Sequence, residues 1–322
     1  MPESGNGSIS GWLVDKSTGE RLVSPDVRLY HIGVPGEIVG EVDKRGTFSF
    51  AGLAEGEYSL GIYDDKFVRH HERMELGASE TLKDLRIELT PGGFLSGRIL
   101  DEDGRPPQSS CFTLLKWGKQ RGKIGYHSNS GDHRVSREDG SFISPPLMPG
   151  RYYLRFAGIL QKLPVADPSK PGNLAVQERI FDFVYPNAYD ICGATSFDVE
   201  SGQTVSGLRI EIRRAVWRRI QGRVTGELPP GQGKFNVIVG RDFGTIDQIG
   251  GGGGPMVQPD GTFEHQLQRG RYSAEVWEFG EPTPDGRSTV LRRFGSPVTL
   301  TVADEDLSGV EIPLGNEIEP KN

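Results

Sequence analysis

The stretch Asp43–Tyr63, DKRGTFSFAGLAEGEYSLGIY, sets the architecture of this chain because its glycines and large apolar residues recur later. The recurring residues of this first copy are Gly46, Phe48, Leu53, Gly56 and Tyr58. All five reappear 94 positions later in REDGSFISPPLMPGRYYLRF, as Gly140, Phe142, Leu147, Gly150 and Tyr152. A third copy, QPDGTFEHQLQRGRYSAEVW, has one residue fewer between its Phe and its Leu, with Gly261, Phe263, Leu267, Gly270 and Tyr272. A set that occurs three times is a folding device rather than a single catalytic centre.

Each copy alternates apolar and polar residues on both sides of a glycine, which predicts a strand, a turn and a second strand. Two more strands recur in register with this motif. The first has a glycine between apolar residues, in ISGWLVD, LSGRILD and IQGRVTG, and the last has the form TLKDLRIEL, TVSGLRIEI or DLSGVEIPL. We therefore predict an all-β chain of three tandem Ig-like or prealbumin-like β-sandwich domains, at residues 1–91, 92–214 and 215–322. These units are called repeats 1, 2 and 3.

Composition supports an all-β chain that is rich in turns. The 322 residues include 45 glycines and 22 prolines, and 35% of the residues are hydrophobic. Units of this size can bury a core of their own, unlike the shorter repeats of solenoids. We expect Phe48, Phe142 and Phe263 to lie in these cores.

The motifs of repeat 2 carry a resemblance to a known family. The order SGRILDEDGRPP, DGSF, LMPGRYYLRF and VSGLRIEI resembles the carboxypeptidase regulatory-like domains, which are small sandwiches of the transthyretin (prealbumin) type. All three repeats share the resemblance, and the segment FVYPNAYDICGATSFDVESGQTVSG is similar to a variant found in tandem repeats of secreted acidobacterial proteins. The resemblance implies a fold and a secreted or surface setting, and it implies no reaction.

Catalytic signatures of related proteins are missing from the sequence. Zinc carboxypeptidases that carry such domains have a His-x-x-Glu pair, whereas in RHHERME Arg73 follows His70 by three positions and Met74 follows His71 by three. No activated nucleophile or pair of general bases can be assigned either. We expect a protein that is not an enzyme and that needs no cofactor.

One loop of repeat 2 contains candidate metal ligands. YHSNSGDHR brings His127, Asp132 and His133 together, and two imidazoles with a carboxylate could hold a divalent transition metal. The same loop could equally be a solvated connection between strands, because neither the spacing nor a fourth ligand matches a known signature.

The insertion in repeat 2, residues 158–194, is the candidate ligand-binding segment. It is too long for a simple hairpin loop, and long ordered loops on rigid scaffolds often form binding sites. Tyr185 and Tyr189 in the insertion, together with His127, are the residues that we expect to contact a polysaccharide or a peptide.

Two further residue types bear on function. Trp12, Trp117, Trp217 and Trp277 follow or lie in apolar strand segments, so we expect them in cores or domain junctions, since a glycan platform would need several rings on one exposed face. Cys111 and Cys192 both lie in repeat 2, a placement that permits an intradomain disulfide and equally permits two free thiols.

Charge and hydropathy restrict the partners and the setting. The net charge of −7 argues against nucleic acid as a partner, and no stretch approaches the roughly 20 apolar residues of a membrane helix. The start MPESGNGSIS lacks the features of a signal peptide. We expect a secreted or cell-envelope protein whose export signal was removed, or a fragment of a larger one.

The function that these observations favour is a non-catalytic structural or interaction protein of the cell envelope or the extracellular space. Exposed sheet edges would let the sandwiches pair with protein partners or with copies of the same chain. The alternative is a ligand-binding module for polysaccharide or peptide that uses the insertion of repeat 2.

Overall fold

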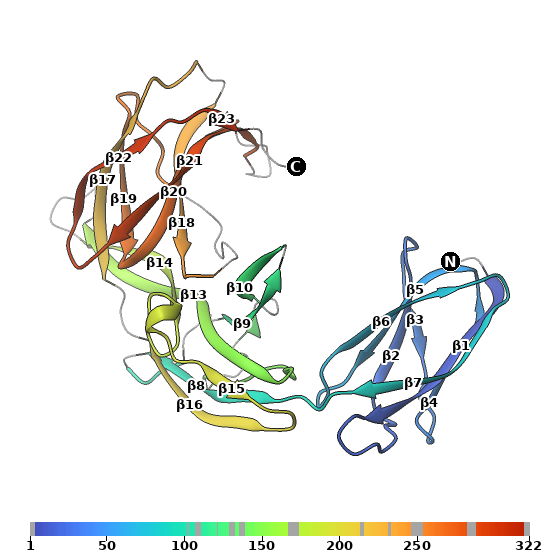
Figure 1. Ribbon diagram of the computed structural model, residues 1–322. Coiled ribbons are helices and arrows are strands. Elements are labelled where there is room, and N and C mark those ends of the chain that lie inside the picture. Colours follow the sequence, from blue (N-terminus) through green and yellow to red (C-terminus); the bar gives the residue numbers. More distant parts are fainter. Residues whose placement is uncertain are drawn as a thin grey trace. The chain divides into compact units, whose positions relative to one another are not determined.

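The computed structural model describes most of the chain as strands (Figure 1). The described residues are 4–101, 103–106, 111–120, 122–128, 133–134, 139–166, 174–212, 216–230, 233–245, 254–281 and 288–318. The chain divides into two compact units. Unit 1 comprises Met1–Arg98, Ser141–Arg151 and Phe197–Leu208, and unit 2 comprises Ile99–Gly140, Tyr152–Ser196 and Arg209–Asn322. Repeat 1 therefore lies in unit 1, repeat 3 lies in unit 2, and repeat 2 contributes to both.

Repeat 1 is a sandwich of two sheets. The first has the order β4-β1-β7 and consists of β1 (Ser4–Asp15), β4 (Thr47–Leu53) and β7 (Thr81–Leu89). The second has the order β3-β2-β5-β6 and consists of β2 (Asp26–His31), β3 (Ile38–Gly40), β5 (Gly56–Tyr63) and β6 (His70–Leu76). Both sheets supply one core, in which Phe48, Leu53 and Tyr58 are at most 2% exposed.

Repeat 2 also contains a three-stranded sheet and a larger sheet. Its three-stranded sheet has the order β12-β8-β16, from β8 (Phe94–Asp101), β12 (Ser141–Ile143) and β16 (Thr204–Ile212). Its larger sheet has the order β10-β9-β13-β14, from β9 (Cys111–Gln120), β10 (Lys123–Ser128), β13 (Gly150–Ala166) and β14 (Leu174–Val184). Two short strands join this larger sheet: β11 (His133–Arg134) pairs with β9, and β15 (Phe197–Val199) pairs with β13.

The insertion of repeat 2 differs from the long loop that its length predicted. β13 and β14 pair from Arg155 opposite Val184 to Ala166 opposite Leu174, so much of residues 158–194 is an extended hairpin. A turn of 3-10 helix, η1 (Ile191–Gly193), follows. Paired strands satisfy their backbone groups within the hairpin, which a loop of this length could not do.

Repeat 3 is again a sandwich of two sheets. One has the order β19-β17-β22, from β17 (Trp217–Thr225), β19 (Thr262–Gln268) and β22 (Leu307–Pro313). The other has the order β18-β20-β21-β23, from β18 (Lys234–Asp242), β20 (Gly270–Phe279), β21 (Val290–Val302) and β23 (Glu317–Ile318). Phe263, Leu267 and Tyr272 belong to their shared core.

The prediction of an all-β chain of tandem β-sandwiches is confirmed. In each repeat the first strand lies between the strand with the recurring Phe and the last strand, and Phe48, Phe142 and Phe263 are at most 4% exposed. The recurring Tyr closes the turn before it: the hydroxyl of Tyr58 donates to Ala54 O at 2.9 Å, and that of Tyr272 donates to Gln268 O at 2.9 Å. The boundaries of the three domains stay a prediction.

The glycine of the first strand lets two strands approach closely. A Cβ atom added to Gly11 would lie 2.2 Å from the carbonyl oxygen of Leu85 in β7, and Gly97 and Gly222 face their last strands in the same way. The parallel pairing of β1 with β7 shifts register at this glycine, as does that of β17 with β22. On the last strand, the residue beside the contact has a positive φ, with 61° at Asp84, 77° at Gly207 and 71° at Gly309.

Candidate functional site

The Tyr-Pro segment of the insertion packs against repeat 3 inside unit 2. The amide of Tyr185 donates to Leu154 O at 2.8 Å, which ties the segment to β13. The Asp190 carboxylate then accepts hydrogen bonds from two amides of η1, and the amide of Ile191 donates to Phe243 O at 3.0 Å. This segment is therefore part of a junction between repeats 2 and 3.

Arg241 at the end of β18 is the central residue of that junction. Its guanidinium donates to Asp182 O at 2.9 Å and to Gln268 Oε1 at 2.7 Å. Burial lowers the pKa of Arg241, because the surrounding protein disfavours its charge. The Phe243 ring lies under Arg241 at 4.9 Å and under Arg155 at 4.8 Å, measured from guanidinium carbon to ring centroid. Arg155, itself 4% exposed, forms an ion pair with Asp182 at 2.5 Å.

The candidate ligand residue Tyr189 takes part in this junction. Its ring, 42% exposed, lies under the guanidinium groups of Arg241 at 5.7 Å and Arg269 at 5.6 Å. Tyr185, four positions earlier, is half-buried. Cation–π contacts of this kind stabilise packing and do not exclude a ligand on the exposed edge.

His127 lies away from the two tyrosines. It belongs to β10, and β9 and β13 separate β10 from β14, the strand that leads to Tyr185. Three strand spacings correspond to about 14 Å. The His127 Nδ1 atom lies 3.4 Å from Gly125 O within its own strand. The structure therefore does not bring the three expected ligand residues together, and their role in binding stays a prediction.

The expected metal site and disulfide fall largely outside the described residues. Asp132 and the side chain of His133 are not described, and among the residues that are, no group of three or more His, Cys, Asp or Glu could hold a metal ion. Cys192 is an exposed, free cysteine in the structure, which gives the disulfide no support. The side chain of Cys111 is not described, so both the metal site and the pairing stay predictions.

A strip of aromatic side chains lies on one face of the larger sheet of repeat 2. We call Trp117, Tyr126 and Tyr153, with the neighbouring Lys119, the aromatic face. Trp117 is opposite Tyr126 in the pairing of β9 with β10, and their ring centroids are 5.0 Å apart. Tyr126 in turn lies 4.8 Å from Tyr153 of β13, and both ring pairs are edge-to-face. Trp117 is 56% exposed, so the expectation that it packs in a core or junction is wrong.

The sequence of β9 explains why this face was missed. Phe112 and Leu114 point to one side of the sheet, whereas Leu115 and Trp117 point to the other, so both faces of the strand are apolar. Apolar residues on both faces are typical of a fully buried strand. A usable signal was present in the adjacent pair Tyr152 and Tyr153, because a core position for one places the other on the opposite face.

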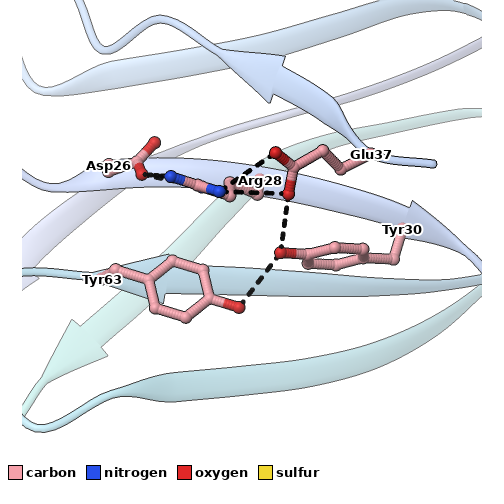
Figure 2. A network of polar contacts seen from close by, with 5 residues as sticks. All are labelled: Asp26, Arg28, Tyr30, Glu37 and Tyr63. Atoms are coloured by element: carbon pink, nitrogen blue, oxygen red, sulfur yellow. Dashed lines mark hydrogen bonds and ion pairs between the residues drawn. The ribbon is translucent and has the colours of Figure 1, made fainter.

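Repeat 1 contains a polar network on the outer face of its larger sheet (Figure 2). Arg28 pairs with Asp26 at 2.6 Å and with Glu37 at 3.0 Å, and the hydroxyls of Tyr30 and Tyr63 lie 3.2 Å apart. The hydrogen bond with Tyr63, partial burial and the hydrogen bond to Glu37 together raise the pKa of Tyr30 to about 12. The three residues of β2 in this network alternate as Asp26-x-Arg28-x-Tyr30, a pattern from which sequence reasoning could have found it.

The residues of this network pair mainly with one another and with their neighbours on the same sheet. The guanidinium groups of Arg28 and Arg69 lie over the Tyr63 ring at 5.5 and 4.9 Å, and His71 contacts the edge of the same ring. With its polar atoms paired and its ring covered by cations, the network rigidifies the sheet rather than offering a stacking surface.

A surface depression of about 580 Å³ opens on repeat 3. Its lining includes Gln221, Met256, Phe263 and Glu264. The carboxylate of Glu264 is paired with Arg219 at 2.6 Å, and this pairing lowers the pKa of Glu264. Among the described residues of this lining, Glu264 is the only one with a titratable side chain, and its pairing with Arg219 does not favour a role as a general base.

No protein-family model matches the chain, and a search of curated proteins finds no match either. Solved structures that match this chain include the Bacillus anthracis TIE protein, at 14% identity over 97% of this chain with a TM-score of 0.25; this chain spans about half (51%) of that one. They also include a minor pilin of Streptococcus agalactiae, at 12% identity over 70% of this chain and 100% of that one, with a TM-score of 0.30. The major pilin subunit of Bacillus cereus is 10% identical over 97% of this chain and 100% of that one, with a TM-score of 0.22.

These TM-scores are too low to transfer an activity, a ligand or a partner to this chain. The resemblance to carboxypeptidase regulatory-like domains accordingly stays a prediction that rests on the motifs. Within the described residues, no helix has the length and apolar character needed to cross a membrane.

Proposed function

We propose that this chain is a non-catalytic interaction protein of the extracellular space or the cell envelope, in which tandem sandwiches act as a spacer that carries binding surfaces. The motif residues support this proposal because they serve the fold in every repeat, as core residues and turn residues. Repeating one scaffold three times lengthens the molecule and increases the surface that is open to partners.

The observation that carries the proposal is the junction around Arg241. The guanidinium groups of Arg155 and Arg241, which both lie over the Phe243 ring, and the backbone hydrogen bond from Ile191 to Phe243 hold repeats 2 and 3 together in one unit. Interdomain contacts inside a chain are often small and permit motion. A junction with buried, hydrogen-bonded side chains favours a stiff pair, which suits a spacer.

Self-association through sheet edges is the part of the proposal that can be tested most directly. In the larger sheet of repeat 1, the edge strand β3 has only three residues, and the opposite edge strand, β6, has the sequence HHERMEL. Short and charged edges oppose pairing with another chain. The edge strand β10 in repeat 2 has the sequence KIGYHS, in which Ile124 is 66% exposed, and is the better candidate.

Size-exclusion chromatography with light scattering on the full chain tests self-association. We expect a mass that rises with protein concentration, and we expect Ile124→Lys on β10 to lower the mass at a given concentration. Val39→Lys on the short strand β3, where the side chain is also exposed, is the matched control and should leave the mass unchanged. A monomer at every concentration would contradict self-association.

A further inference from the structure

The face of the larger sheet in repeat 2 is buried at one end and open at the other. Thr113 and Arg155 are opposite each other on β9 and β13, at 2% and 4% exposure, and Arg155 lies over Phe243 of the junction. Trp117 is four residues further along β9, on the same side of the strand, and is 56% exposed. The open end is therefore a continuation of a surface that already packs against protein.

The aromatic rings of this open end contact one another. Tyr126 contacts the Trp117 ring and the Tyr153 ring edge-to-face, with interplanar angles of 75° and 86°. Each ring is held by a neighbour on the adjacent strand, and such pairs are stabilising beyond the area that they bury. These contacts restrict the conformations of the rings, which lowers the free energy that a ligand stacking on Trp117 would lose to ordering them.

The local charge is opposite in sign to that of the whole chain. Residues 111–128 contain four basic residues, Lys116, Lys119, Arg121 and Lys123, and no acidic residue, whereas the net charge of the chain is −7. Lys119 lies on the side of β9 that carries Trp117. It is exposed and has no ion-pair partner among the described residues. An exposed cation beside stacked rings complements a ligand with an apolar surface and a negative charge.

We propose that the aromatic face binds an anionic polysaccharide, whose sugar rings stack on Trp117 and whose carboxylates pair with Lys119. This inference rests on the proposed function, an interaction protein, and assigns a ligand class to a surface distinct from the Tyr-Pro segment of the insertion.

Single-stranded nucleic acid is the other polymer that stacks on aromatic side chains beside cations. It needs a basic groove that follows a backbone with one phosphate per nucleotide. Among the described residues one exposed lysine, Lys119, lies on the face, and the chain carries an excess of acidic residues. A polysaccharide with isolated carboxylates matches this lower density of positive charge.

Isothermal titration of the full chain with polygalacturonate, and with the same polymer after methyl esterification, separates charge from sugar structure. We expect binding to the acidic polymer with at least about fivefold higher affinity than to the ester. Raising sodium chloride from about 50 mM to about 500 mM should weaken binding to the acidic polymer, because salt screens exposed charges.

Four variants assign the binding to the aromatic face. Trp117→Ala should lower the affinity at least about tenfold, since it removes the ring on which the sugar stacks. Trp117→Phe should retain part of the affinity, which distinguishes a smaller stacking surface from a misfolded hairpin. Lys119→Glu should remove the preference for the acidic polymer. Lys123→Glu changes an exposed lysine of the same hairpin on the opposite side of the sheet, and should alter affinity by less than about twofold.

Several outcomes would overturn the inference. They are no binding to either polymer, equal affinity for both, unchanged affinity in folded Trp117→Ala, a Lys123→Glu effect as large as that of Lys119→Glu, and tighter binding to a single-stranded DNA oligonucleotide. Light scattering in the same buffer keeps the two proposals apart. A self-associating chain that binds no polysaccharide would contradict only the ligand, and a monomer that binds would contradict only self-association.

Discussion

A methyl group added to Gly222 would meet a different obstacle from one added to Gly309. At Gly222 it would lie 2.5 Å from Val310 O and 2.5 Å from the Phe263 ring, whereas nothing lies within 4 Å at Gly309. Gly309 instead has a φ of 71°, which L-residues with a side chain adopt at a cost of about 1–2 kcal/mol. Gly222→Ala overlaps with the backbone of Val310 and with a core ring, so we expect a cost of about 3 kcal/mol, the upper end of the usual range for overpacking.

Hydrogen exchange of peptides from β17 and β22 measures both costs, because it reports the free energy of local opening. Gly309→Ala should lower that free energy by the smaller amount. A larger effect of Gly309→Ala than of Gly222→Ala would contradict the assignment of close strand contact to the glycine of the first strand.

The recurring Phe residues allow the same test in each repeat. Phe48→Ala, Phe142→Ala and Phe263→Ala each remove a core side chain that is at most 4% exposed, and each should destabilise its own repeat by about 3–5 kcal/mol. Pulse proteolysis in urea, with fragments assigned to repeats, measures the loss. A loss below about 1 kcal/mol in any repeat would show that its Phe is not a core residue.

At this scale the sequence predicted the core residues and missed the exposed rings. Repetition identified Phe48, Tyr58 and their counterparts without any structural information, because only residues needed by the fold recur in all copies. Trp117 occurs in one copy only. Its hydrophobic character alone favoured burial, and the direction of its side chain depended on a strand register that the sequence did not reveal.

The turn before β4 is an element whose stability depends on pH. The Asp43 carboxylate accepts hydrogen bonds from the amides of Thr47 at 2.9 Å and Arg45 at 2.8 Å, and these bonds lower the pKa of Asp43. The stabilisation is therefore complete above the ordinary pKa of about 4 and is lost as the pH falls through the lowered value. We expect repeat 1 to become less stable in this acidic range.

Asp43→Asn isolates this contribution, because its amide oxygen can accept the same hydrogen bonds without titrating. Pepsin digestion in urea between about pH 4.5 and about pH 2 should show a smaller loss of stability for the variant than for the wild type. Parallel curves for the two proteins would mean that other groups dominate acid unfolding of repeat 1.

The hairpin of β13 and β14 is an element that could not be predicted from the sequence. The length of residues 158–194 predicts a loop, and the segment PVADPSKPGNLAV adds three prolines and four further residues that favour turns, Asp167, Ser169, Gly172 and Asn173. The strand pairing instead extends to Ala166 opposite Leu174, since paired strands satisfy each other's backbone groups.

For the molecule as a whole, Arg241 should contribute more stability than an exposed arginine nearby. Arg241→Ala leaves Gln268 Oε1 and Asp182 O without a buried donor, and we expect unit 2 to lose about 2–3 kcal/mol. Arg271 forms an exposed ion pair with Asp242 at 2.7 Å, so Arg271→Ala should cost less than about 1 kcal/mol.

Hydrogen exchange around η1 checks this difference, since the amide of Ile191 is bonded to Phe243 across the junction. Exchange there should accelerate in Arg241→Ala and stay close to the wild-type rate in Arg271→Ala. Equal rates in both variants would contradict the role of the junction in fixing repeats 2 and 3. This role could not be predicted from VIVGRDFG, because Arg241 stands next to Asp242 there as in an ordinary surface pair.

The parallel pairing of first and last strands has a mechanical consequence. In repeat 1, β1 and β7 run side by side from Ser8 opposite Thr81 to Asp15 opposite Leu89, and β17 and β22 are paired in the same sense. Tension applied at the two ends of such a unit pulls these strands past each other along their length, so the inter-strand hydrogen bonds bear the load together rather than one after another. A chain of these units would resist stretching because its strands are loaded in shear, a property that suits a protein under tension between two attachment points.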